Sequence, residues 1–223
     1  MEEARRTFIP AAGHDWCLPL YDPLVRLMGV DQARRALIEQ AALSSGQVAL
    51  DVGCGTGSLA ILVKGLHPGV QVAGVDPDPK ALERARRKAM RANVAVRLDR
   101  GFAGALPYPD ASFDRVLSSF VFHHLRGDEK AKMLSEARRV LKPGGSLHLL
   151  DFAGPEPGTD GFVARWLGSR PLLLDNGEGR IVTLMREAGL EDPRRVFGGR
   201  IVLGLFAYSC FQAAVPQEAR RAC

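Results

Sequence analysis

One stretch constrains the chain more than any other: Val48-Ala-Leu-Asp-Val-Gly-Cys-Gly-Thr-Gly57. Four of its first five residues are apolar and the two end residues are β-branched, which predicts a short buried strand. Gly53, Gly55 and Gly57 follow, and the apolar segment after them has helical spacing. Glycine lets the backbone approach a ligand closely, and the start of a helix offers unpaired N–H groups. Strand, glycine loop and helix together predict a nucleotide-type site.

Two carboxylates accompany this loop. Asp51 interrupts the first strand near its carboxyl end, and Asp76 ends a second apolar strand about 20 residues beyond the glycines, where an acid can accept from ribose hydroxyls. The pattern Gly55-x-Gly57-x-x-Ala60 also suits a dinucleotide, but Asp51 would repel a pyrophosphate. S-adenosylmethionine has no phosphate, and its ammonium group could bind Asp51 directly or through water. The residues therefore favour S-adenosylmethionine over NAD.

Strand-like and helix-like segments alternate through the middle of the chain. This alternation is typical of βαβ units and predicts an α/β fold, a Rossmann-like doubly wound sheet with helices on both faces. Ligands of such sheets lie at the carboxyl ends of the strands, where Asp51 and Asp76 fall. The expected strands are 48–52, 70–75, 94–98, 113–119 and 146–153, and the expected helices are 57–66, 78–92 and 128–141.

The flanking segments predict further elements. Near the end of the chain, residues 194–197 and 201–209 flank Gly198-Gly199, which predicts an antiparallel hairpin that turns at these glycines. The stretch Lys142-Pro-Gly-Gly145 is expected to stop a helix and reverse the chain. Two more helices are expected, at 31–43 and 178–188.

The glycine loop resembles the first motif of class I S-adenosylmethionine-dependent methyltransferases. Leu106–Ser119 is similar to a later motif of that family, and so is the stretch from Glu136 to Asp151. The resemblance covers about residues 46–153 and is greatest with the small-molecule group that includes quinone-biosynthesis C-methyltransferases. It implies a seven-stranded, mostly parallel sheet with a C-terminal antiparallel hairpin, in a single domain over residues 1–215 followed by a tail, 216–223.

The resemblance also implies how the cofactor is held. The glycines would shape the cradle, Asp51 would engage the ammonium, and Asp76 would take the ribose hydroxyls. The family usually has an acid for the adenine amino group, but Phe102 stands in that place here; its ring would pack on adenine or, equally, belong to the core. Ala103 would offer its backbone N–H. The expected cofactor-binding residues are Asp51, Gly53, Cys54, Gly55, Gly57, Asp76, Pro77, Phe102, Ala103 and Ser119.

His123 and His124 follow the fourth expected strand and are the candidates for a general base, because the pKa of histidine is close to neutrality. Adjacent side chains point in different directions, so at most one should face the acceptor; both could also be structural. Residues 1–45 are expected to form a helical cap and 154–180 an insertion on the substrate side. Apolar character and placement predict an acceptor pocket lined by Trp16, Tyr21, Phe120, Phe162 and Trp166.

Composition leaves several functions open. The net charge is +5, and much of the excess positive charge lies in residues 80–91. This segment is more typical of a solvent-exposed helix face than of a surface that binds nucleic acid. An NAD-linked oxidoreductase, an RNA methyltransferase and a cyclase that binds the cofactor without methyl transfer are the alternatives. No apolar run suits a membrane span, no signal sequence begins the chain, and no cysteine spacing suits a metal. We expect a cytoplasmic monomer or homodimer that acts on a small molecule without a metal ion.

Overall fold

The computed structural model describes residues 29–154, 176–201 and 206–217. They form a seven-stranded sheet in the order β3-β2-β1-β4-β5-β7-β6. The first five strands are parallel, and β7 runs antiparallel to both of its neighbours. The Rossmann-like sheet with a C-terminal antiparallel hairpin is therefore confirmed. The strands are β1 Val48–Val52, β2 Gln71–Asp76, β3 Arg97–Arg100, β4 Phe113–Ser119, β5 Leu141–Phe152, β6 Glu191–Ile201 and β7 Phe206–Ala214.

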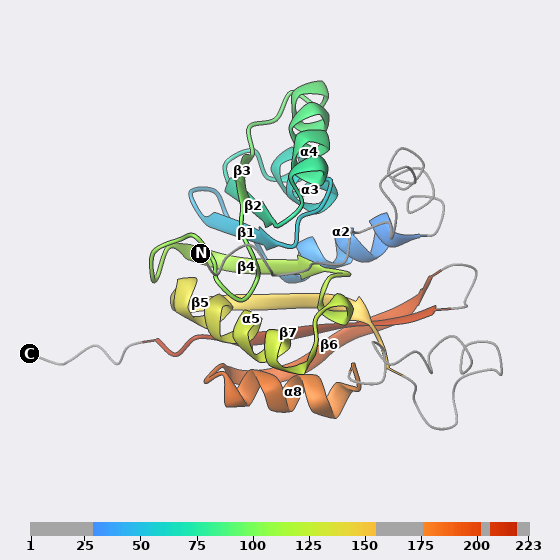
Figure 1. The fold of residues 1–223 in the computed structure, drawn as a ribbon, viewed down its shortest axis with the longest axis vertical. Helices are drawn as coiled ribbons and strands as arrows, with labels where there is room; N and C mark the ends of the chain where they lie inside the picture. The colour runs from blue at the N-terminus through green and yellow to red at the C-terminus, as the bar shows by residue number, and fades with distance from the viewer. Residues whose placement is uncertain (1–28, 155–175, 202–205, 218–223) are drawn as a thin grey trace, which may run out of the picture.

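Helices cover both faces of this sheet (Figure 1). On one face α2 and α3 bury apolar residues such as Leu37 and Val63 against the sheet. On the other face α5 and α8 contribute residues such as Met133 and Ile181 to a second core. The helices are α2 Val30–Gln40, α3 Ser58–Leu66, α4 Pro79–Arg91, α5 Gly127–Val140 and α8 Glu178–Glu187.

The alternation of side chains along β1 links the two cores and places one carboxylate. Leu50 and Val52 belong to the core beneath α5 and α8, whereas Ala49 belongs to the core beneath α2 and α3. Because successive strand residues point to opposite faces, Asp51 shares the side of Ala49 and points toward α3. The strand order reverses between β1 and β4, so the carboxyl ends of these strands border the crevice where this class of sheet binds ligands.

Three expectations differ from the structure: the start of the third strand, the turn at residues 142–145 and the position of the hairpin turn. The third strand begins at Arg97 rather than 94, because Asn93 takes a left-handed conformation (φ 51°) as α4 ends and the chain needs further residues to join the sheet. Lys142-Pro-Gly-Gly145 is not a free turn: it lies within β5 as an irregularity, since Leu141 pairs with Phe113 and Ser146 pairs with Arg115.

The prediction that the hairpin turns at Gly198-Gly199 is wrong. Both glycines lie inside β6, where they pair with Ser209 and Tyr208. A Cβ atom at Gly198 would come within 2.7 Å of the Tyr208 carbonyl oxygen. Glycine therefore allows β6 and β7 to approach each other closely here. The expected cap and insertion lie largely outside the described residues; the described part of the cap, α2, packs on the sheet.

Candidate active site

The glycine loop is held in a conformation that other residues adopt poorly. Gly53, Gly55 and Gly57 have φ values of 71°, 51° and 76°, in the left-handed region. A Cβ atom at Gly53 would also lie 2.5 Å from Cγ1 of Val121, which follows β4. The carbonyl oxygen of Val75 accepts from the backbone N–H groups of both Gly53 and Cys54. The loop is thus pressed between the ends of β2 and β4.

Asp76 lies at the carboxyl end of β2 and organises the opposite side of this loop. One carboxylate oxygen accepts from the Gly55 N–H and the other from the Asp78 N–H, both at 2.9 Å. Asp78 in turn caps α4 by accepting from the Lys80 N–H. Burial raises the pKa of Asp76, and the two backbone donors partly oppose this. Each carboxylate oxygen still has a lone pair for a hydroxyl donor.

Asp51 is buried beside the glycine loop and accepts a backbone hydrogen bond. Its side chain is 2% exposed, it does not line the cavity described below, and it accepts from the Ala60 N–H at 3.2 Å. Ala60 is the third residue of α3, and Gly57 at the N-cap has no side chain to accept this bond. Asp51 therefore satisfies a backbone donor at the N-terminus of α3, and its expected contact with the cofactor's ammonium stays a prediction. Burial raises the pKa of Asp51 to about 7, against the opposing attraction of Arg34.

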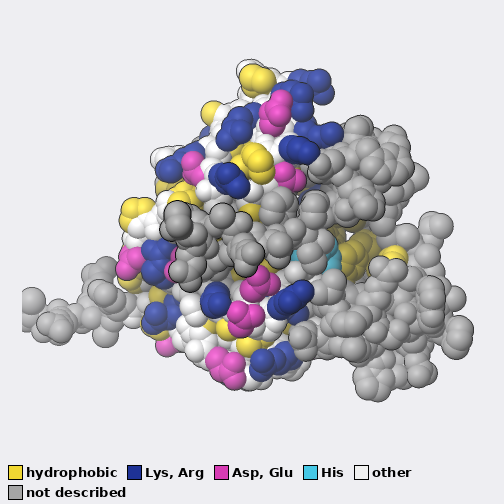
Figure 2. All heavy atoms as spheres, viewed as in Figure 1, with side chains coloured by type: hydrophobic (Ala, Val, Ile, Leu, Met, Phe, Trp, Pro, Cys, Tyr) yellow, Lys and Arg dark blue, Asp and Glu magenta, His cyan; other side chains and the backbone are white. Residues whose placement is uncertain are grey.

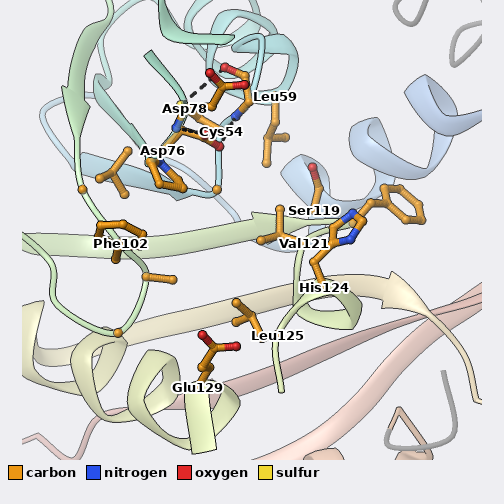
Figure 3. Close-up of a pocket in the computed structure, with 18 of the residues that line it drawn as sticks. Cys54, Leu59, Asp76, Asp78, Phe102, Ser119, Val121, His124, Leu125 and Glu129 are labelled. Carbon is orange, nitrogen blue, oxygen red and sulfur yellow. Dashed lines mark hydrogen bonds between the residues drawn. The ribbon is translucent and has the colours of Figure 1, made fainter. Parts of the chain in front are cut away.

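A cavity of about 450 Å³ opens between the glycine loop, the β3–β4 loop, the end of β4 and the start of α5 (Figure 3). This volume is in the range of ordinary small-molecule sites. Of the expected cofactor-binding residues, the cavity is lined by Gly53, Cys54, Gly55, Asp76, Pro77, Phe102, Ala103 and Ser119. Asp51 and Gly57 lie behind it and support its wall.

Phe102 and Ala103 form the far wall from the end of β4 (Figure 3). Phe102 is half-buried, which distinguishes it from a core residue. The nearby acid, Asp99, does not take over the missing adenine contact. It accepts from the Tyr108 hydroxyl at 3.0 Å, forms an ion pair with Arg97, and is not a lining residue.

The end of β4 supplies an apolar wall. Phe120 has a φ of 57°, unusual for a non-glycine residue and of a kind that clusters at functional sites. Phe120 lines the cavity, and its ring packs against Phe152 at a centroid distance of 5.0 Å. Phe152 also packs against Phe206, on β7. The strained residue at the end of β4 is thus both part of the cavity wall and part of an aromatic cluster.

The two histidines lie on a 3-10 turn, η3 (Phe122–His124), and have different surroundings. His124 lines the cavity, whereas His123 does not. Nδ1 of His123 lies 2.7 Å from a carboxylate oxygen of the buried Asp151, which also accepts from the His123 backbone N–H. This contact fixes the orientation of the His123 ring. The two imidazole rings are in contact, with centroids 4.0 Å apart and planes tilted by 40°.

The protonation of His124 follows from these surroundings. Burial lowers its pKa to about 4; the neighbouring His123 adds to this shift, and Asp151 opposes it. His124 is therefore neutral at pH 7 and has a lone pair available. Among the described residues, no group of three His, Cys, Asp or Glu side chains could hold a metal ion.

Sequence reasoning missed two functional candidates. Arg34 of α2 lines the cavity although the expected helix was treated only as packing, and Asp151 fixes His123. Both had a signal: Arg34 shares the apolar face of Leu37 and Ile38 by helical spacing, and Asp151 is an acid at the carboxyl end of a strand. The expected pocket residues Trp16, Tyr21, Phe162 and Trp166 lie outside the described residues.

This site fits an adenosyl cofactor better than a dinucleotide. Asp76 can accept from ribose hydroxyls, Phe102 offers a flat apolar surface to a base, and no side chain can enter at Gly53 without striking Val121. Asp76 and Asp78 make the neighbourhood of the loop unfavourable for a pyrophosphate. Fold and site together define an α/β protein that binds an adenosyl group without phosphates.

Comparison with known proteins gives the family. Residues 49–145 match the model of a methyltransferase domain. The demethylmenaquinone methyltransferase of Deinococcus radiodurans is 43% identical over 150 residues, which are 66% of this chain and 61% of that protein. The enzyme of the same name from Thermus thermophilus is 42% identical, over 66% of this chain and 67% of that protein. The chain belongs to the family of class I S-adenosylmethionine-dependent methyltransferases, and its similarity is to the quinone-biosynthesis type.

Further comparisons agree with this assignment. The 27-O-demethylrifamycin SV methyltransferase of Amycolatopsis mediterranei is 38% identical, over 67% of this chain and 56% of that protein. The matched part of this chain thus spans between about half and two thirds of the length of these relatives. Phosphoethanolamine N-methyltransferase 2 of Haemonchus contortus, solved with S-adenosylmethionine, shares the fold with a TM-score of 0.76 at 20% identity, over 93% of this chain and 58% of that one. The family resemblance read from the sequence is confirmed, and S-adenosylmethionine is the family's cofactor.

The alternative functions are not favoured. A [4+2]-cyclase shares the fold with a TM-score of 0.68 at 21% identity, over 84% of this chain and 81% of that one, but fold alone does not fix chemistry. The sequence relatives named above are all methyltransferases. On the face shown in Figure 2, the described Lys and Arg side chains are interspersed with Asp and Glu. No helix in the described ranges is long and apolar enough to cross a membrane.

Proposed function

We propose that this protein transfers the methyl group of S-adenosylmethionine to a small, fairly apolar acceptor that lies against Phe120. The observation that supports this most is the continuity of one cavity from Asp76 and Phe102 to Phe120 and His124. The first end suits ribose and adenine, and the second end is aromatic and carries a neutral imidazole. When bound, the cofactor supplies an electrophilic methyl group on a sulfonium.

The acceptor proposed is a ring-bearing molecule of quinol or phenol character. Two relatives are named for a demethylated menaquinone and one for a demethylated rifamycin, and their names motivate this proposal. Phe120 lines the cavity and is supported by Phe152, which packs against it and against Phe206, so an aromatic residue held in place by other rings is available to an aromatic acceptor. The chain's main task is to hold this ring in line with the methyl group and away from water, which can contribute about 7–11 kcal/mol.

We further propose that His124 receives the proton that the acceptor loses. Its low pKa keeps the imidazole neutral, and the adjacent His123 ring, fixed by Asp151, limits the orientations available to it. A positioned base contributes about 10²–10⁴-fold in rate. His123 is a positioning residue in this scheme, because it contacts His124 but is not among the residues that line the cavity.

The test is incubation with isotopically labelled S-adenosylmethionine and a panel of demethylated naphthoquinols and phenols, followed by mass spectrometry. The expected product is an acceptor heavier by one labelled methyl group, with one S-adenosylhomocysteine formed per product. If S-adenosylhomocysteine binds but no member of the panel is methylated, the acceptor class is wrong. Conversion of an acceptor without release of S-adenosylhomocysteine would instead favour a cyclase-type reaction.

We also propose a cytoplasmic location. Cys54 and Cys210 are buried free thiols in the described part of the chain, which suits a reducing compartment. Fractionation of the producing cells, with detection of the protein by antibody, tests this; recovery in an oxidising compartment would refute it.

A further inference from the structure

Arg34 is a cation in an unusual place. It lies on α2, outside the βαβ unit that carries the glycine loop, and its side chain nevertheless lines the cavity. The residue is only 8% exposed. Arginine is rarely buried to this extent without a partner of opposite charge, because removing a charge from water is costly.

The hydrogen bonds of Arg34 leave much of its guanidinium unused. Nε donates to the Ser119 hydroxyl, and Nη1 donates to the Asp31 carboxylate, each at 3.4 Å. These distances are longer than those of ordinary N–H···O bonds, which lie at about 2.7–3.2 Å. A guanidinium has five N–H donors, so within the described residues three donors have no acceptor. No buried side-chain nitrogen in the described residues lacks a partner, so Nη2, which has no printed acceptor, is not fully buried, and Arg34 is one of the residues that line the cavity.

The charges around Arg34 are also incomplete. Asp51 attracts it through space, but the raised pKa of that carboxyl leaves it only partly ionised near neutral pH. Asp31 is a half-exposed partner on the first turn of the same helix, with a side-chain exposure of 38%. An anionic group in the cavity beside Ser119 would complete both the hydrogen bonds and the charge balance of Arg34.

We propose that Arg34 binds the carboxylate of the amino-acid end of S-adenosylmethionine and S-adenosylhomocysteine. The inference rests on the proposed function, since it names the ligand of that same cavity. A planar guanidinium matches a carboxylate through two parallel N–H···O bonds. Ser119 places Arg34 at the carboxyl end of β4, beside the glycine loop and across the cavity from Phe102. With the base at Phe102 and the ribose at Asp76, the amino-acid end of the ligand comes to this side.

Arg34 also changes the electrostatic character expected of the crevice. The acids alone would favour any cation, whereas Arg34 and Asp51 together form a pair of opposite charges. Such a pair suits a zwitterion, whose carboxylate faces Arg34 and whose ammonium is attracted by Asp51 behind the loop. The site would therefore select the complete amino acid over an adenosyl amine that lacks the carboxylate.

The experiment compares two thioethers by isothermal titration calorimetry. S-adenosylhomocysteine carries both the ammonium and the carboxylate, whereas S-adenosyl-3-thiopropylamine is the same molecule without the carboxylate. Both are titrated into the wild type, Arg34→Met, Arg34→Lys and the control Arg35→Met, which removes an exposed cation from the same helix. 5′-Methylthioadenosine, which lacks the whole amino-acid end, reports on the adenosine site alone.

The wild type should prefer S-adenosylhomocysteine over the amine by about 10- to 100-fold, the value of hydrogen bonds to a charged group. Arg34→Met should lose that preference while its affinity for the amine changes by less than about 3-fold. Arg34→Lys should retain part of the preference because it keeps the charge without the planar fork, and Arg35→Met should behave like the wild type.

Three results would overturn the proposal. One is equal affinity of the wild type for the two thioethers, which needs no variant. Another is an equal loss of affinity for both ligands in Arg34→Met, which would mean that Arg34 only supports Ser119 and α2. A third is unchanged binding of S-adenosylhomocysteine by a folded Arg34→Met. This would mean that Arg34 does not bind the ligand's carboxylate and would instead be available to an anionic acceptor. If the wild type binds none of the three compounds, the proposed function itself fails.

Discussion

The contact between the glycine loop and Val121 allows a quantitative test of the site. Gly53→Ala meets two obstacles: a φ of 71° and a new Cβ atom 2.5 Å from Cγ1 of Val121. A left-handed conformation costs a non-glycine residue about 1–2 kcal/mol, and overpacking costs about 1–3 kcal/mol. The substitution should therefore lower the free energy of unfolding by about 2–5 kcal/mol.

The two costs can be separated with a second substitution. Val121→Ala removes both Cγ atoms and leaves the Cβ atom of residue 121, 3.0 Å from the new methyl group, as the nearest contact. The double variant should therefore be more stable than the sum of the single effects predicts, by about 1–3 kcal/mol, while the conformational cost at residue 53 remains.

Urea unfolding followed by circular dichroism measures the stability of the wild type, the two single variants and the double variant. Gly65→Ala is a matched control: Gly65 lies inside α3 and a Cβ atom there meets nothing within 4 Å, so it should raise the stability by about 0.5–1 kcal/mol. Additive effects of the two substitutions at 53 and 121 would refute the steric argument. A neutral Gly53→Ala would refute the geometry of the loop altogether.

Three further outcomes are expected. Asp76→Ala should weaken S-adenosylhomocysteine by about 10- to 100-fold, since hydrogen bonds to a charged acceptor are lost; unchanged calorimetric affinity would remove Asp76 from the ribose role. His124→Phe should lower the single-turnover rate of methyl transfer by about 10²–10⁴-fold without changing cofactor affinity. The wild-type rate should fall only as the pH drops through about 4, where His124 becomes protonated, and an equal rate in the variant would exclude it as the base. Asp51 holds its proton up to about pH 7 in the native state but only to about 4 when unfolded, so the native state binds more protons between these values and stability must fall as the pH rises. Asp51→Asn should lack this part of the pH dependence in urea titrations at pH 4 and pH 8, and parallel curves for the two proteins would contradict the raised pKa.

The residues that sequence reasoning placed correctly are those whose roles are local. The positions of Gly53, Gly55 and Asp76 in the cavity follow from a strand, a turn and a second strand that are close in the chain. A short apolar run that is β-branched at both ends and the helical spacing after the glycines sufficed to predict β1 and α3. The family similarity followed from the same residues and from the motifs after them.

Local pattern failed where the outcome depended on a distant partner. Gly198-Gly199 has the composition of a turn, yet Tyr208 on the neighbouring strand requires glycine there. Asp51 is an acid near the end of a strand, and only the structure shows that one of its oxygens accepts from the Ala60 N–H, which Gly57 at the N-cap of α3 cannot satisfy. In both cases the contact depends on a partner outside the local pattern.

The sequence by itself determined the sheet, its ligand-binding edge and the family, because hydrophobic period and glycine spacing are properties of short segments. Only the tertiary structure decided which of two adjacent histidines lines the cavity and that an arginine from α2 enters it. These decisions depend on distances between residues far apart in the chain: 28 positions separate His123 from Asp151, and 85 separate Arg34 from Ser119. Such distances are set by the folding of the whole sheet and its helices.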